Sequence, residues 1–212
     1  MSARGIRISD YVSPDCWLRL DLPPWEACTR AAELVASQFA NLSTSYRIIG
    51  PGIAAHHTAI IENGAVLKAP CIIGENCFVA AYAYLRGGVW LDSNVIIGPS
   101  AEIKSSFFFS GSKAAHLNFI GDSIVGRNAN IEAGAILANY RNERADKEIV
   151  CFDGRHHIHT GCDKFGSLVG DGCRIGANAV LAPGTILARG TIVRRLTLID
   201  QEKAAAPLTP PG

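Results

Sequence analysis

The sequence predicts an all-β fold, a left-handed parallel β-helix of hexapeptide repeats. Isoleucine, leucine or valine stands at every sixth residue from Ile61 to Ile103. An α-helix repeats apolar positions every 3.6 residues and a flat strand every 2, so neither explains this period. A small residue follows most of these anchors by four places, and turn residues such as Asn63-Gly64 recur in register. Large residues would therefore fill a three-sided prism, and small or turn residues would form its corners.

The same period returns from Phe119 to Leu137 and from Val169 to Val193. Three hexads make one coil, so the seventeen anchors predict five to six coils stacked about 4.8 Å apart. We expect this β-helix to be one domain over residues 53–200.

The two interruptions of the period, residues 104–119 and 140–168, are expected to leave the coil. The second alternates in polarity on both sides of Asp153-Gly154, which predicts a β-hairpin with a two-residue turn. A stack of coils offers no deep pocket of its own. We therefore expect function to reside in these excursions and in grooves between subunits.

Both ends of the chain are expected to lie outside the coil. Residues 1–52 are predicted to be a short helical cap, because Pro24 suits a first turn and residues 24–40 repeat apolar side chains at helical spacing. A helix packed over the first coil would cover its open end. Residues 201–212 contain three prolines and are expected to be a disordered tail.

Composition argues against several kinds of partner. The formal net charge is +1 and no basic run occurs, so we expect no nucleic acid partner. No signal segment and no stretch of roughly 18 apolar residues is present, so we expect a cytoplasmic protein without a membrane partner. Three of the seven cysteines occupy small-residue positions of the coil, which indicates buried, reduced thiols.

Three motifs follow one another near the first interruption. Residues 115–122 read Ala-His-Leu-Asn-Phe-Ile-Gly-Asp, residues 128–131 read Asn-Ala-Asn-Ile, and residues 138–140 read Ala-Asn-Tyr. This order resembles the acetyltransferase half of bifunctional N-acetylglucosamine-1-phosphate uridyltransferases. The resemblance covers about residues 53–200. The hairpin that ends at residues 160–166 is similar to an insertion of the archaeal sugar-1-phosphate nucleotidylyltransferase and acetyltransferase branch.

The resemblance implies acetyl transfer from acetyl-CoA, as a co-substrate, to an amino-sugar phosphate, with no metal required. His116 would be the general base, a role that suits an imidazole that is neutral near pH 7. Glu102 would support its protonation state, and Asn139 would complete the catalytic group. The implied substrate contacts are Arg86, Lys104, Phe119, Asn130 and Tyr140, and the implied cofactor contacts are Ala177 and Lys164. Arg86 and Lys104 would meet the phosphate, whose charge fixed cations complement.

Three residues depart from the family pattern. Phe119 replaces a tyrosine, Glu132 a glycine and Ala177 a serine. The acyl donor, the acceptor sugar and the choice between nitrogen and oxygen acylation therefore stay open.

Three functions remain under consideration. The leading hypothesis is a homotrimeric acyltransferase, with coenzyme A between adjacent prisms and a sugar phosphate or nucleotide sugar near His116. The second is a non-catalytic sugar-nucleotide-binding or scaffold subunit that partners a separate nucleotidyltransferase. The third is a zinc lyase like the β-helical carbonic anhydrases, because His157 and His159 would share one face of a strand.

Overall fold

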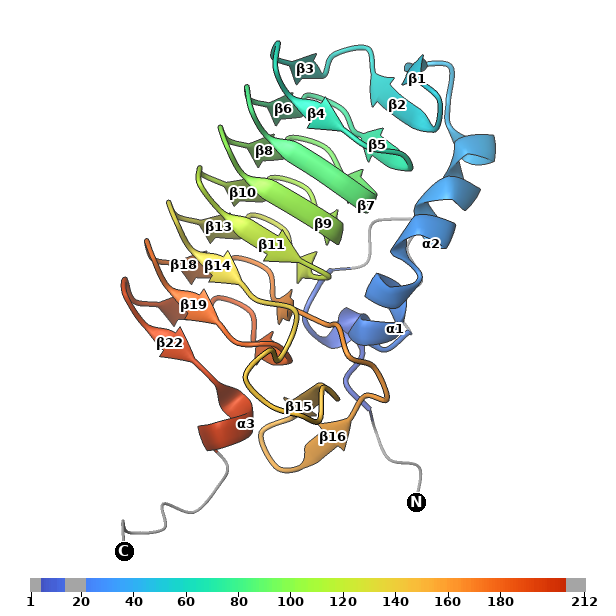
Figure 1. The fold of residues 1–212 in the computed structure, drawn as a ribbon. Coiled ribbons are helices and arrows are strands. Elements are labelled where there is room, and N and C mark those ends of the chain that lie inside the picture. Colours follow the sequence, from blue (N-terminus) through green and yellow to red (C-terminus); the bar gives the residue numbers. More distant parts are fainter. Residues whose placement is uncertain (1–4, 14–21, 205–212) are drawn as a thin grey trace, which may run out of the picture.

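The computed structural model describes residues 5–13 and 22–204. Within these residues the chain winds into a three-sided parallel β-helix, whose strands stack along one axis (Figure 1). We call the seven-stranded sheet side A. Its strands are β3 (Ile60–Ile61), β6 (Phe78–Val79), β8 (Ile96–Ile97), β10 (Lys113–Ala114), β13 (Asn130–Ile131), β18 (Arg174–Ile175) and β21 (Ile192–Val193).

Sides B and C belong to one thirteen-stranded sheet, because two long strands, β7 (Tyr84–Leu91) and β9 (Glu102–Phe108), continue from side C into side B. The other strands of side B are β2 (Ile53–His56), β5 (Cys71–Ile73), β12 (Ile124–Val125), β17 (Ser167–Val169) and β20 (Thr185–Leu187). Those of side C are β4 (Val66–Leu67), β11 (Phe119–Gly121), β14 (Ile136–Leu137), β19 (Val180–Leu181) and β22 (Leu198–Ile199).

Side A has seven rungs in the described part of the chain, more than the five to six coils predicted. The difference arises because residues 104–119 remain in the coil, so the prediction of an excursion there is wrong. Phe108 aligns with Leu91, and the next inward residue on side C is Ile120, which aligns with Ile103. The step from Ile103 to Phe108 is five residues, and another five-residue step follows Ile120. Because each of these two corners is one residue shorter, the six-residue period is lost from the sequence although the coil continues.

The molecule has two hydrophobic clusters. The first is the prism interior, filled by the inward residues of all three sides. The second lies on the outside of side B, where Ile72, Trp90, Phe107 and Leu168 are buried beneath other segments. Side B is therefore a face that must be covered, since exposing such residues would cost roughly 1.5–3 kcal/mol each.

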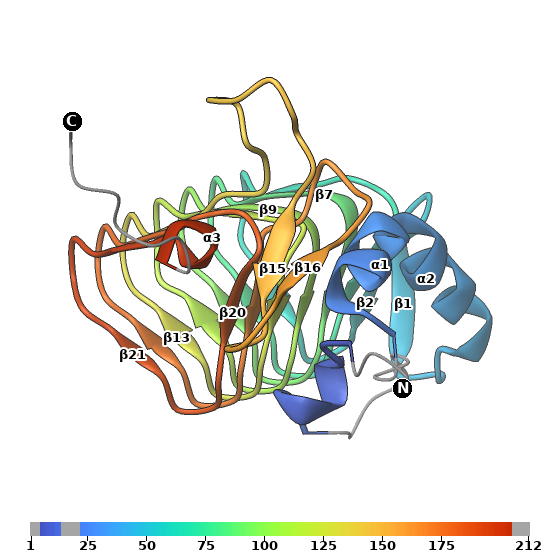
Figure 2. The same cartoon turned by 90° about the horizontal axis from the view of Figure 1, so that it is seen from below.

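The N-terminal helices supply part of this cover. They are η1 (Ile8–Asp10), α1 (Pro24–Thr29), α2 (Ala31–Ser37) and η2 (Gln38–Asn41). Helix α2 packs against β7 so closely that a Cβ on Gly88 would lie 2.6 Å from the backbone carbon of Ala31. Figures 1 and 2 show the helices alongside the β-helix rather than over its first coil. The helices were predicted correctly but their position was not, because the apolar surface they cover is side B. At the first coil, β1 (Tyr46–Gly50) pairs antiparallel with β2.

The second excursion is confirmed. Between β14 and β17 the chain leaves the coil and forms a hairpin of β15 (Val150–Phe152) and β16 (His157–His159). Its inner residues Ile149, Cys151 and Phe165 join the cluster on side B, beside the helices (Figure 2).

The chain does not become irregular directly after β22. Helix α3 (Gln201–Ala204) forms at the start of the expected disordered tail, and Gln201 bonds both backbone groups of Ile186 at 2.7 and 2.8 Å. For residues 201–204 the prediction is therefore wrong, and residues 205–212 lie outside the described part of the chain.

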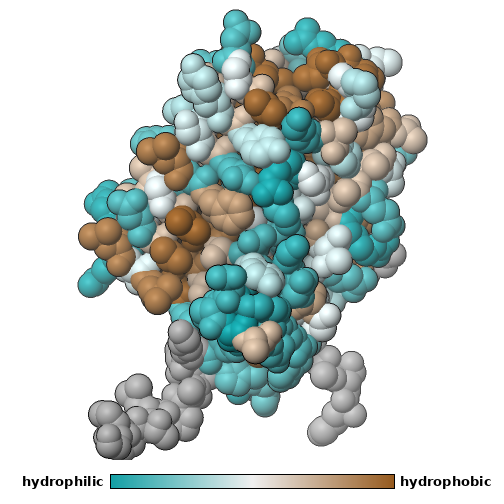
Figure 3. Space-filling model, viewed as in Figure 1, coloured by the Kyte–Doolittle hydropathy of each residue, from teal (hydrophilic) through white to brown (hydrophobic). Residues whose placement is uncertain are grey.

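Side C carries exposed apolar residues at both ends of the stack. Val66, Ile136 and Leu198 are 44, 38 and 63% exposed. Figure 3 shows hydrophobic residues at several places on the face seen there, and mostly hydrophilic ones near the hairpin. No helix in the described ranges is both long and apolar enough to span a membrane.

Candidate active site

The structure separates the predicted site residues into groups. One group lies along side C and at the corner where the chain turns toward side B. We call it the side C cluster, and it contains Arg86, Glu102, Lys104, Phe119, Asn139 and Tyr140. His116 and Ala177 lie at the other end of side C, at the corner with side A, whereas Asn130 is on β13 of side A and Lys164 is in the excursion.

A hydrogen-bonded group at the inner corner involves a residue that sequence reasoning did not select. Lys104 Nζ donates to both carboxylate oxygens of Asp122, at 2.8 and 2.6 Å, and Asn139 Nδ2 also donates to this carboxylate. Asp122 is only 7% exposed at its side chain. It ends the Gly-Asp of the motif, which was the available signal. Asp122 thus neutralises Lys104 and orients Asn139.

A second ion pair lies beside it on side C. Arg86 Nε donates to Glu102 Oε1 at 2.8 Å, and each side chain is about one-third exposed. Glu102 is therefore bonded to Arg86 rather than to His116. Phe119 faces outward in register with Glu102, and a Cβ on Gly121 would lie 2.9 Å from its ring and 2.8 Å from Asn139. Only glycine leaves room for these two side chains to meet at this corner.

The backbone around His116 is held by the following rung. The N–H of Gly134 donates to the carbonyl of His116 at 3.0 Å, and Asn118 Nδ2 donates to the carbonyls of Glu132 and Ala135 at 2.8 and 3.1 Å. Asn118 is 3% exposed, whereas His116 is exposed. The corner thus presents a solvent-accessible imidazole on a fixed backbone.

Within one chain, His116 is not beside the side C cluster. Leu137 aligns with Ile120, which places Asn139 level with Asp122, six residues beyond His116. Side C therefore separates His116 from Asn139 by roughly 15–20 Å. One small sugar could not contact both within a single chain.

Ala177 lies in the same corner column as His116, with Ala133 on the rung between them. Its N–H donates to Glu132 Oε2 at 2.9 Å, and Arg195 donates to both oxygens of Glu132 at 2.9 Å. The hydrogen bond from Ala177, followed by that from Arg195, lowers the pKa of the Glu132 carboxyl below its ordinary value. The Glu132 carboxylate is thus charged and connects Ala177 to Arg195 along this column.

Two open grooves run along side A on either side of Asn130. One, of about 590 Å³, is lined by Phe78, Ile96 and Lys113. The other, of about 470 Å³, is lined by Glu132 and by three arginines. These arginines are Arg174, Arg194 and Arg195. Asn130 belongs to both grooves and is remote from the side C cluster.

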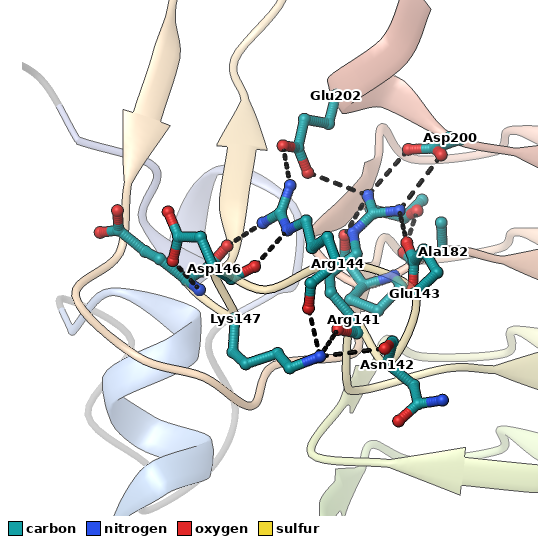
Figure 4. A network of polar contacts seen from close by, with 12 residues as sticks. Arg141, Asn142, Glu143, Arg144, Asp146, Lys147, Ala182, Asp200 and Glu202 are labelled. Atoms are coloured by element: carbon teal, nitrogen blue, oxygen red, sulfur yellow. Dashed lines mark hydrogen bonds and ion pairs between the residues drawn. The ribbon is translucent and has the colours of Figure 1, made fainter.

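Tyr140 begins a loop that a buried ion-pair network holds (Figure 4). Arg141, 4% exposed at its side chain, binds Asp200 through two nitrogens at 3.1 and 2.8 Å and also reaches Glu202 at 3.1 Å. Lys147 Nζ donates to the carbonyls of Arg141 and Asn142 and lies 5.2 Å from the Tyr140 ring centre. The C-terminal helix therefore helps to position the loop that follows Asn139.

The remaining predicted positions lie in the excursion. Lys164 is exposed, and its carbonyl accepts from Cys162 Sγ at 3.6 Å. His159 Nδ1 is 2.8 Å from Glu148 Oε2, and this carboxylate raises the pKa of the histidine. His157 is exposed. Among the described residues no three or more His, Cys, Asp or Glu side chains form a group that could hold a metal.

The cysteines in the described part of the chain are thiols, and only Cys162 among them is partly exposed. Burial raises the pKa of the Cys71 and Cys77 thiols to about 12. These side chains therefore behave as small apolar residues of the coil.

Two family models match this chain, and both describe hexapeptide repeats. Residues 70–105 match the family described as bacterial transferase hexapeptide (six repeats), and residues 168–194 match the hexapeptide repeat of succinyl-transferase. A crystal structure of a hexapeptide transferase family protein from Anaplasma phagocytophilum overlaps 69% of this chain and 74% of that one, with 17% identity and a TM-score of 0.49.

Curated relatives share a longer segment. The bifunctional protein GlmU of Clostridioides difficile is 36% identical over 141 residues, which is 66% of this chain and 25% of that protein. GlmU of Pseudoalteromonas atlantica is 36% identical over 126 residues, 57% of this chain and 24% of the relative. The chain thus spans about a quarter of the length of these relatives. It is a hexapeptide-repeat β-helix protein whose coil is similar in sequence to about a quarter of GlmU.

Proposed function

We propose that the protein is an acyltransferase that moves the acyl group of an acyl-coenzyme A, in the first instance acetyl-CoA, to the amine of an amino-sugar phosphate or nucleotide sugar. The observation that carries this proposal is His116, an exposed imidazole on a fixed corner within the segment homologous to GlmU. In the reaction, His116 takes a proton from the amine while the nitrogen attacks the thioester carbonyl. The carbon–sulfur bond breaks, and coenzyme A leaves as the thiol after taking up a proton.

The distance between His116 and Asn139 supports an assembly in which two chains form each site. Since about 15–20 Å separates these residues in one chain, His116 of one copy would face the side C cluster of another. The exposed apolar residues of side C, including Ile136 and Leu198, supply a surface that such an assembly would bury. We propose a homotrimer on this basis, with coenzyme A in the groove between neighbouring prisms.

The side C cluster suggests how the acceptor is held. Asn139 is oriented by the hydrogen bond that its Nδ2 donates to Asp122. Arg86 and Lys104 would interact with the acceptor phosphate, although each already has a carboxylate partner. A phosphate would therefore have to share these cations, which predicts modest affinity for the acceptor alone.

The test is release of free thiol from acetyl-CoA in the presence of glucosamine-1-phosphate, followed by a panel of amino-sugar phosphates and amino nucleotide sugars. We expect turnover with at least one acceptor, and a loss of roughly 10²–10⁴-fold in kcat in His116→Ala. His157→Ala, an exposed histidine of the hairpin, is the matched control and should retain wild-type turnover. Turnover that is unchanged in His116→Ala would refute the role of this residue.

The second candidate is a sugar-nucleotide-binding or scaffold subunit without turnover. The observation that favours it is again the separation of His116 from Asn139 within one chain. Analytical ultracentrifugation distinguishes the two proposals by the oligomeric state of the protein. A monomer that binds a nucleotide sugar and releases no thiol from any donor would favour the scaffold.

A further inference from the structure

The groove beside Ala177 has an unusual charge arrangement. Arg174, Arg194 and Arg195 line it, against the single carboxylate of Glu132. Within the described residues only Arg195 of these three is in a salt bridge, and Arg174 and Arg194 are exposed residues. The groove therefore has an excess of positive charge on an otherwise nearly neutral chain of net charge +1.

The Glu132 carboxylate accepts hydrogen bonds from two donors of this groove, the Ala177 N–H and the Arg195 guanidinium. The β-strand register aligns Ile131, Ile175 and Val193, so Glu132 reaches across the rung of Ala177 to Arg195 two rungs away. Its Oε2 accepts from a backbone N–H and a guanidinium, both at 2.9 Å. A backbone N–H together with an arginine fork is a typical arrangement for binding a phosphate oxygen.

The contacts of Glu132 can be broken at low cost. Its side chain is 36% exposed and that of Arg195 is 71% exposed. Water and salt screen exposed ion pairs of this kind, so they contribute little to stability. An incoming anion that brings more than one negative charge could therefore replace the carboxylate.

We propose that Glu132 is a specificity-determining residue of this groove, whose carboxylate competes with the phosphate oxygens of a ligand for the Ala177 N–H and the Arg195 guanidinium. The ligand is taken to be the acyl-coenzyme A donor of the proposed function. The choice of donor rests on the proposed function, whereas the competition by Glu132 rests on the geometry alone. Loss of the carboxylate charge should strengthen ligand binding, because Arg195 is released and a like charge near the phosphate is removed. Substitution of most residues that line a binding groove weakens ligand binding instead.

The test is calorimetric titration of the full chain with coenzyme A at low salt. Glu132→Gln retains an oxygen that can accept from Ala177 and removes only the charge. Its Kd for coenzyme A should be about fivefold lower than that of the wild type, and the difference should shrink as salt rises. Glu33→Gln is the matched control, because Glu33 forms a similar exposed pair with Arg30, at 2.7 Å, on helix α2. It should bind like the wild type.

A Kd in Glu132→Gln equal to or higher than that of the wild type would overturn the proposal, as would the absence of binding in both proteins. Arg195→Gln should raise the Kd, and an unchanged value would also count against it. A parallel titration with uridine diphosphate tests the source of the phosphate. If Glu132→Gln strengthens binding of the diphosphate but not of coenzyme A, the groove belongs to a nucleotide-sugar acceptor and the donor assignment is wrong.

These outcomes are distinguishable from failure of the proposed function. Tighter coenzyme A binding in Glu132→Gln, without thiol release from any donor, would support the groove and refute the acyltransferase. Thiol release with an unchanged Kd in Glu132→Gln would support the enzyme and refute the role of Glu132. Circular dichroism of each variant confirms that the coil is folded before the titration.

Discussion

Removal of the Arg141 side chain is expected to detach the C-terminal helix from the loop after Asn139. In Arg141→Met, the carboxylate of Asp200, 8% exposed in the native protein, loses its bidentate partner at 2.8 and 3.1 Å. Removing one partner of a buried ion pair costs about 3–5 kcal/mol, because the remaining buried charge loses the opposite charge that offset its desolvation. The free energy needed to open α3 and residues 141–148 locally should fall by about this amount.

Hydrogen–deuterium exchange measured by mass spectrometry is the appropriate assay, since the coil need not unfold when this segment opens. A cost of about 3 kcal/mol corresponds to roughly a 150-fold loss of protection. We expect that loss in α3 and residues 141–148, with β13 and β18 unchanged. The matched control is Arg30→Met, which breaks an exposed pair with Glu33 and should change exchange less than about fivefold.

Two results would refute this reasoning. The first is exchange in the loop within about threefold of the wild type. The second comes from the double variant Arg141→Met with Asp200→Asn, which removes both charges and should recover most of the lost protection. If the double variant exchanges as fast as the single one, loss of the Arg141–Asp200 charge pair is not the cause.

Gly98→Ala should lower the melting temperature by roughly 5–10 °C, because its Cβ would lie 2.5 Å from the carbonyl carbon of Ala115 on the next rung; an unchanged melt would contradict this packing. Ile97→Ala, at a fully buried position, should cost about 2–5 kcal/mol in urea unfolding. In NMR titrations, His159 should titrate above its ordinary pKa of 6.5 and return toward it in Glu148→Gln. Since the folded pKa is raised, this pair stabilises the hairpin below about pH 6.5 and loses its effect as pH rises through the raised value.

The candidate site could be predicted from sequence only in part. The family resemblance identified Lys104 and Asn139, whereas Asp122, which joins them, received no role although it ends the Gly-Asp of the first motif. Asp200 lies 59 residues from Arg141. A contact between residues so far apart in the sequence produces no periodic pattern from which it could be predicted. Glu132 was noted as a departure from the family pattern, and only the aligned rungs revealed its contact with Arg195.

By itself, the sequence determined the parallel β-helix, because a buried side chain at every sixth residue satisfies no other regular backbone. It also determined the hairpin excursion, through alternation around a short turn. The tertiary structure decided that residues 104–119 stay in the coil, because stacking against Leu91 and Val125 compensates for a five-residue step. It also decided that the N-terminal helices lie on side B. An amphipathic stripe specifies that a helix needs an apolar partner, and only the folded coil determines where that partner is.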